Sequence, residues 1–139
     1  MSKKVAARKS LNKEEIHNLD IEIGFVEGVL KRDPGFVEAM RVLGDDYTRR
    51  GRFADGLRID EQLCILRPND PLSHYNLACS YSLTLQLDQA AVILERAINL
   101  GYRDFTWMTR DPDLQNLRKH ALYQRIRDKI KRLKARKPD

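Results

Sequence analysis

Residues 40–47 read MRVLGDDY, and residues 74–81, which lie 34 positions further along the chain, read HYNLACSY. Both stretches place a leucine, then a glycine or alanine, then a tyrosine at the same positions. This spacing puts the three residues on one face of a helix. A pattern that recurs at such an offset predicts a stacked array of helical repeats, whereas an ordinary helical bundle has no sequence repeat.

Small residues recur in the same phase in both copies. Gly44 and Ala78 share a position on the first helix of each pair, and Gly56 and Ala90 share one on the second. A position that accepts only a small side chain indicates that another helix crosses closely there. The pattern therefore predicts two antiparallel helix pairs packed at these four residues.

The pattern is similar to that of the tetratricopeptide repeat family, W-x2-L-G-x2-Y followed by A-x3-F and P. The resemblance covers most of the chain and implies an all-α fold, a right-handed α-α superhelix of about seven helices. Five residues depart from the family pattern: Met40 and His74 stand for its tryptophan, Asp60 for a second-helix aromatic, Leu63 for an alanine and Tyr102 for a proline.

The repeat phase divides the chain. Asn12 and Glu15 have the spacing of a capping box, so a helix is expected to begin at residue 13. Gly51 predicts the end of the first helix of the first pair, and Asp70 followed by Pro71 predicts another helix start. We expect a basic flexible tail at 1–11 and a single domain at 12–136. The domain comprises a leading helix at 13–32, one repeat at 37–70, a second at 71–104, and a partial repeat with a basic capping helix at 105–136. That last helix is expected over about 120–134.

Composition argues for a protein without catalytic machinery. The chain has 139 residues, of which 42% are hydrophobic and 33% charged, and no apolar run approaches membrane-spanning length. The basic N-terminus is not followed by an apolar stretch, so it does not have the pattern of a secretory signal, and we expect a cytoplasmic protein.

The sequence contains no phosphate-binding glycine loop and no nucleophile elbow. We therefore expect no enzymatic activity and no cofactor.

The cysteines and histidines lack the spacing of a metal site. Cys64 and Cys79 lie on different predicted helices, where two reduced thiols are expected. His17, His74 and His120 are far apart in the sequence. We therefore expect no bound metal.

The net charge of +6 is unevenly distributed. Residues 1–11 carry +4, and residues 118–139 carry ten Lys and Arg against two Asp, or +8, so residues 12–117 must carry −6. An acidic body with basic ends is the result.

The resemblance implies that the first helices of successive units line a concave groove, which in this family holds a peptide or helix of another protein. Helical geometry then places Arg41 and Arg110 on either side of Tyr75, which would suit a peptide with some negative charge. The predicted groove residues are Glu38, Arg41, Asp45, Thr48, Arg49, Tyr75, Asn76, Cys79, Ser82, Thr109 and Arg110, with Leu72 and Thr106 beside them. The alternative for each is a solvated helix face.

Some members of the family hold a C-terminal carboxylate with a Lys, Asn, Asn, Lys, Arg set. The matching positions here are Arg41, Asp45, Asn76, Thr106 and Arg110. Asp45 puts an anion where the ligand carboxylate should lie, and Thr106 removes a cation, so this mode of binding is disfavoured.

The basic C-terminal helix supports a rival function. Its predicted patch consists of Arg125, Lys129, Lys131, Arg132 and Lys134. Such a cluster could bind nucleic acid or an anionic membrane surface, although it is also what the solvated face of a capping helix looks like. Self-association through an exposed end of the array is a further possibility.

Overall fold

The computed structural model describes residues 10–136, and every regular element in that range is helical. The expected flexible tail therefore lies mostly outside the described residues, since only Ser10 and Leu11 of it are included. Of the described helices, none is both long and apolar enough to cross a membrane.

Five long helices form the first two thirds of the domain: α1 (Lys13–Arg32), α2 (Val37–Arg50), α3 (Phe53–Leu66), α4 (Pro71–Leu83) and α5 (Leu87–Leu100). Shorter elements follow: α6 (Phe105–Met108), the 3-10 turn η2 (Pro112–Leu114), α7 (Gln115–Arg118) and α8 (Tyr123–Ala135). About seven helices were expected; the described residues form eight α-helices, because the partial repeat breaks into two single turns.

Local capping signals set several helix ends at the predicted residues. The Asn12 side chain accepts a hydrogen bond from the Glu15 amide at 2.8 Å, and the Glu15 carboxylate accepts one from the Asn12 amide at 2.9 Å. Asp70 accepts from the Leu72 amide in front of Pro71. Gly51 ends α2 with a φ of 85°, in the left-handed region where glycine is favoured.

The final helix begins later than predicted. The expected start was about residue 120, but the chain makes a turn there and α8 starts at Tyr123. In this turn the Leu122 amide donates to Nδ1 of His120 at 3.1 Å, and the Tyr123 amide donates to the His120 carbonyl at 3.0 Å. A side chain that bonds the local backbone in this way competes with helix formation.

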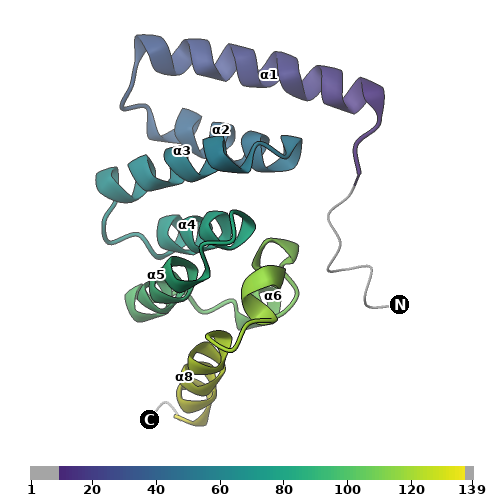
Figure 1. The fold of residues 1–139 in the computed structure, drawn as a ribbon. Helices are drawn as coiled ribbons and strands as arrows, with labels where there is room; N and C mark the ends of the chain where they lie inside the picture. The colour runs from purple at the N-terminus through teal and green to yellow at the C-terminus, as the bar shows by residue number, and fades with distance from the viewer. Residues whose placement is uncertain (1–9, 137–139) are drawn as a thin grey trace.

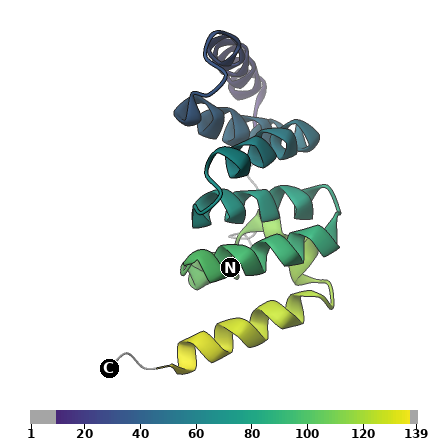
Figure 2. The ribbon, with the colours of Figure 1, turned by 90° about the vertical axis from the view of Figure 1, so that its left-hand side faces the viewer.

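The long helices α1 to α5 are stacked in chain order, and each of α1 to α4 packs against the next helix in the chain, while α6 lies to one side of α4 and α5 (Figure 1). The view from the side shows the same succession of layers, with α8 closing the end opposite to α1 (Figure 2). The helix pairs α2–α3 and α4–α5 thus follow each other as the repeat predicts.

The small residues lie at close helix crossings. A Cβ atom on Gly44 would be 3.1 Å from Oδ1 of Asp60, and one on Gly56 would be 3.2 Å from Oγ1 of Thr48. Ala78 and Ala90, the corresponding residues of the second pair, are fully buried. The two glycines therefore lie where α2 and α3 approach each other closely, and the two alanines lie in the packed interior.

Buried apolar residues form separate clusters along the stack. Side chains of α4, α5, α6, η2, α7 and α8 share one large core. α1 packs on α2 through a smaller core centred on Leu19, Ile23 and Leu43. Met40 and Leu63 belong to a third cluster between α2 and α3. The C-terminal elements are therefore part of the same packed body as the second repeat.

Replacing Ala90 with Leu should test the crossing of α4 and α5. Because Ala90 is fully buried, three extra carbon atoms must displace its neighbours, and we expect the free energy of unfolding to fall by about 1–3 kcal/mol. Chemical denaturation measures this change. The control is Ala54→Leu on the exposed face of α3, for which we expect a change within about 0.5 kcal/mol. Equal effects at the two positions would contradict a tight crossing.

Candidate functional site

A small polar cavity of about 80 Å³ lies between α2, α3 and α4. We call it the α2–α4 cavity. It brings together five of the predicted groove residues, Arg41, Asp45, Thr48, Asn76 and Cys79. Its other lining residues are Gly44, Asp60, Leu63, Ser80, Leu83 and Asp113.

The guanidinium of Arg41 is already occupied by the chain itself. One of its nitrogens lies 2.9 Å from Oδ2 of Asp70, and another lies 3.4 Å from Oγ of Ser73. Ser73 also donates to Asp70 at 2.7 Å, so the three side chains form one network at the start of α4. Arg41 is therefore not a free anion-binding group at this surface.

Asp60 on α3 is the main buried polar residue of the cavity. Its Oδ2 accepts a hydrogen bond from Ser80 on α4 at 2.6 Å. Burial raises the pKa of Asp60 to about 6; the Ser80 hydrogen bond acts in the opposite direction, and the carboxylates of Asp113 and Asp45 raise it further. Sequence reasoning noted that Asp60 departs from the family pattern but did not place it in a site. The signal in the sequence that could have identified Asp60 as a site residue is its charge at a position that the repeat places in the core.

Residues 111–118 cover the face of α4 that carries Tyr75, Cys79 and Ser82. Tyr75 donates a hydrogen bond to Oδ2 of Asp111 at 2.7 Å, and Cys79 lies 3.7 Å from the same oxygen. Ser82 accepts from the Leu117 amide at 3.2 Å and is fully buried. Tyr75, Cys79 and Ser82 therefore contact the chain itself instead of forming an exposed groove face.

Further contacts hold this segment in place. One nitrogen of Arg118 lies 2.8 Å from the carbonyl oxygens of both Met108 and Asp111. The Tyr75 ring stacks on that of Tyr102, with ring centroids 4.1 Å apart. Burial, followed by the neighbouring Cys79 and Asp111, raises the pKa of Tyr75, so its hydroxyl stays a donor.

The remaining predicted groove residues do not line the cavity. Glu38, Thr109 and Arg110 are exposed, and Arg49 points toward Asp46 at 3.7 Å. Of the carboxylate-binding positions, Thr106 and Arg110 are likewise outside the lining. Thr48 does line it, but it is buried, and its hydroxyl donates to the Gly44 carbonyl at 3.0 Å.

The basic patch is partly neutralised by α5. Arg125 and Lys129 lie 3.1 and 3.4 Å from the Glu95 carboxylate. The other three residues, Lys131, Arg132 and Lys134, are exposed and form no ion pair with any residue from 10 to 136.

No group of three metal-binding side chains occurs within residues 10–136. Both cysteines are free thiols, and burial raises the pKa of Cys64 to about 12. Low-pKa thiolates are the reactive form of cysteine, so this residue is suited to packing and not to nucleophilic chemistry.

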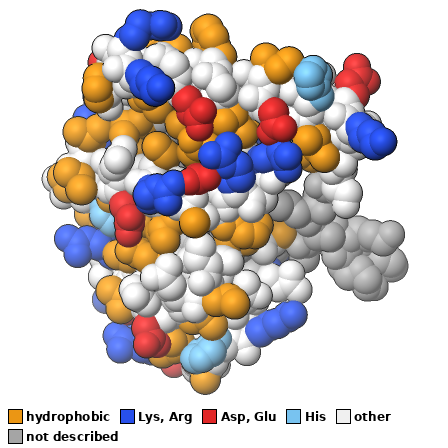
Figure 3. All heavy atoms as spheres, turned by 45° about the horizontal axis from the view of Figure 1, so that its top comes forward, with side chains coloured by type: hydrophobic (Ala, Val, Ile, Leu, Met, Phe, Trp, Pro, Cys, Tyr) orange, Lys and Arg blue, Asp and Glu red, His pale blue; other side chains and the backbone are white. Residues whose placement is uncertain are grey.

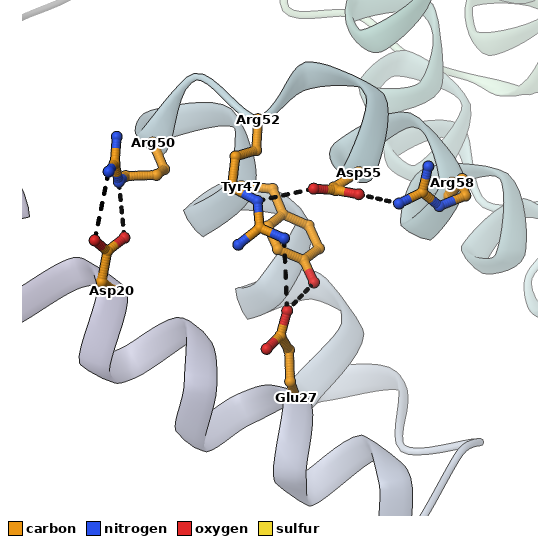
Figure 4. A network of polar contacts seen from close by, with 7 residues as sticks. All are labelled: Asp20, Glu27, Tyr47, Arg50, Arg52, Asp55 and Arg58. Atoms are coloured by element: carbon orange, nitrogen blue, oxygen red, sulfur yellow. Dashed lines mark hydrogen bonds and ion pairs between the residues drawn. The ribbon is translucent and has the colours of Figure 1, made fainter.

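A seam of polar contacts joins α1 to the first repeat (Figure 4). Arg50 binds Asp20 with a nitrogen–oxygen distance of 2.7 Å. Glu27 accepts from Tyr47 at 2.5 Å and faces Arg52 at 3.8 Å. Arg52 in turn pairs with Asp55, as does Arg58. Figure 3 shows acidic and basic side chains side by side on this part of the surface, not a patch of a single sign.

A buried carboxyl group lies beside this seam. Asp46 is 2% exposed, and its Oδ2 has no hydrogen-bond partner among the described residues. Burial raises the pKa of Asp46 to about 7; the Glu22 carboxylate of α1 raises it further, and Arg49 partly opposes this. The interface of α1 and α2 therefore favours the protonated form of Asp46.

Comparison with known proteins finds a partial relative. No protein-family model matches the chain. Over 79 residues it is 33% identical to a chloroplastic protein of Arabidopsis thaliana. The match covers 55% of this chain and 24% of that protein, so the chain corresponds to about a quarter of the relative.

Replacing Tyr75 with Phe should weaken the attachment of the 111–118 segment. The change leaves the buried Asp111 carboxylate without its 2.7 Å donor, so we expect the free energy of unfolding to fall by about 1–3 kcal/mol. The control is Tyr81→Phe on the same helix, whose hydroxyl bonds the less buried Glu61 at 3.1 Å. A loss at Tyr81 as large as that at Tyr75 would show that the Asp111 contact is not special.

Replacing Asp46 with Asn should change the pH dependence of stability. The folded-state pKa of Asp46, about 7, lies above its ordinary value, so its favourable contribution is present below about pH 4 and is lost as the pH rises toward 7. Asn cannot ionise. As the pH rises from 4 to 8, the free energy of unfolding of the variant should therefore increase by about 1–3 kcal/mol relative to that of the wild type. Denaturation experiments at several pH values measure this change.

The control for Asp46→Asn is Asp88→Asn, which changes an exposed carboxylate at the start of α5. Its difference from the wild type should stay nearly constant over this pH range. A constant difference for Asp46→Asn as well would show that the buried carboxyl group does not titrate near neutrality.

Proposed function

We propose that this chain is a non-catalytic adaptor of the tetratricopeptide type, a right-handed helical solenoid that holds a peptide or helix of a partner protein against its inner face. The proposal rests chiefly on one observation. The repeated helix pairs bring Arg41, Asp45 and Asn76, which are distant in sequence, to a single cavity between α2 and α4.

The packing supports the family assignment within this proposal. Gly44 and Gly56 lie at the close approach of α2 and α3, and the equivalent Ala78 and Ala90 of the second pair are fully buried. Tyr47 and Tyr81, at equivalent repeat positions, both donate to a glutamate 20 residues earlier, Glu27 or Glu61. Equivalent contacts in equivalent positions are what a repeat architecture produces.

The partner is expected at the first half of the inner face. Residues 111–118 cover α4 from Tyr75 to Ser82, whereas Asp45 is exposed and Asn76 is half-buried at the edge of the cavity. A ligand segment would therefore cross α2 and the beginning of α4.

The rival function through the basic patch has weaker support. Arg125 and Lys129 already serve to attach α8 to Glu95 of α5. The other three cations, Lys131, Arg132 and Lys134, match the solvated face of a capping helix. We therefore treat nucleic-acid or membrane binding as an outcome to be tested and not as the proposal.

The compartment is also a matter of proposal. The name of the partial relative places that protein in the chloroplast. A cytoplasmic location for this chain stays a prediction. Fractionation of the native host would decide between the two.

Selection from an unbiased displayed peptide library tests the adaptor function. Peptides that bind should lose at least about tenfold in affinity on Asn76→Phe, because the added ring obstructs the α2–α4 cavity without changing charge. Gln89→Phe, on the exposed face of α5, is the matched control and should bind normally. Calorimetric titration measures both.

A second control neutralises the basic patch with Lys131→Gln, Arg132→Gln and Lys134→Gln together. Selected peptides should bind this variant as they bind the wild type. Failure to select any peptide, or dependence on the basic patch instead of Asn76, would refute the proposed function.

A further inference from the structure

Two carboxylates from different elements lie around the α2–α4 cavity. Asp45 is on α2 and Asp60 is on α3. Among the described residues that line the cavity, the one cation is Arg41, and it is paired at 2.9 Å with Asp70, which does not line it. The cavity wall therefore carries an excess of negative charge.

Asp60 is incompletely satisfied. Only 6% of the surface of Asp60 is exposed. One of its carboxylate oxygens, Oδ2, accepts a hydrogen bond from Ser80. Its Oδ1 receives no hydrogen bond from any residue between 10 and 136. That oxygen lies on the side of Gly44, where a Cβ atom would be only 3.1 Å away. Because Asp60 lines the cavity, this oxygen is the free acceptor that it offers to a donor of the ligand.

Asp45 offers a second unpaired carboxylate at the mouth of the cavity. It is exposed, and it forms neither a hydrogen bond nor an ion pair with the described part of the chain. The amide of Asn76, across the cavity on α4, adds a carbonyl oxygen that can accept a further hydrogen bond. The cavity thus offers several acceptors to a ligand that brings donors.

Apolar side chains complete the wall. Leu63 is buried, and Leu83 is half-buried beside it. A volume of about 80 Å³ is suited to the end of one long side chain and not to a whole peptide segment. A ligand that combines methylene groups with a positively charged donor at its end fits both parts of this wall.

We propose that the α2–α4 cavity receives a lysine or arginine side chain of the bound partner, with the cationic group against Asp60 and Asp45. This inference rests on the proposed adaptor function and names the chemistry that its partner must supply. It replaces the expectation of a partially acidic ligand, because Arg41 is held by Asp70.

Charge favours a basic side chain over the other occupants. An anion would meet the carboxylates of Asp45 and Asp60, and like charges at this range are repulsive. A metal ion has no group of three ligands within residues 10–136. A basic segment of the chain itself, which carries Lys3, Lys4, Arg8 and Lys9, has the right charge and is therefore one of the outcomes to be tested.

Fluorescence titration with amidated nonapeptide pools tests the inference. Each pool has randomised flanks and one fixed central residue: lysine, arginine, glutamine, norleucine or glutamate. The lysine or arginine pool should bind at least about tenfold more tightly than the glutamine and norleucine pools, and the glutamate pool should bind least. Preference for norleucine or glutamate would overturn the inference while leaving the adaptor function intact. An absence of binding by every pool would count against both.

Two variants locate the cation. Asp60→Asn removes the charge but keeps an oxygen that can accept the hydrogen bond of Ser80. It should reduce the ratio of the affinities for the basic and the neutral peptide pools by at least about fivefold. Asp45→Asn changes an exposed residue, so it should keep the fold, and it should reduce the preference similarly. Asp88→Asn on α5 is the matched control and should leave the preference unchanged. An undiminished preference in both cavity variants would overturn the assignment.

A final comparison separates a partner from the chain's own tail. The full-length chain with Lys3, Lys4, Arg8 and Lys9 changed to glutamine should bind the lysine pool within about threefold of the wild type. A gain of about tenfold or more would show that the tail occupies the cavity, and this would overturn the assignment to a partner.

Discussion

The close approach of α2 and α3 at Gly44 and Gly56 is the constraint on which the described architecture depends. Both glycines leave so little space that any side chain would press on Asp60 or Thr48. The same approach brings the Asp60 carboxylate to the face shared with α4, where Ser80 donates to it. A crossing that packs two helices together therefore also creates the polar floor of the α2–α4 cavity.

The second repeat uses its equivalent surface differently. Asp60 lines the α2–α4 cavity, whereas the surface around Tyr75 is covered by Asp111 and the residues that follow. The filled part is stabilised by directed contacts, since Arg118 binds two backbone carbonyls and Ser82 binds the Leu117 amide. The face of α4 around Tyr75 is therefore covered by the chain itself, whereas the α2–α4 cavity lies beside the covered part.

Helix ends were predictable from the sequence because the signals are local. Asn12, Gly51 and the pair Asp70–Pro71 each act on a backbone only a few residues away, and the structure has the corresponding helix ends at these positions. The break near His120 was missed, because its side chain competes for the local backbone in a way that periodicity does not reveal.

The candidate site was only partly predictable, because some of its contacts join residues that are far apart in the sequence. Asn76 and Asp45 follow from helical phase, and both line the cavity. Asp60 was not assigned to it, because an acid at a core position does not say which neighbour will satisfy it. The burial of Tyr75 depends on Asp111, 36 residues later, and no repeat pattern encodes that meeting.

The division of the apolar core has a consequence for how the chain loses its structure. α1 is attached by a small cluster and a charged seam, whereas α4 to α8 share one large cluster. In arrays of this kind, stability is a sum of local and nearest-neighbour terms, so cooperativity extends only as far as the interfaces are strong. Heat or denaturant would then release α1 in an earlier step, and a single midpoint would average over two separate melting events.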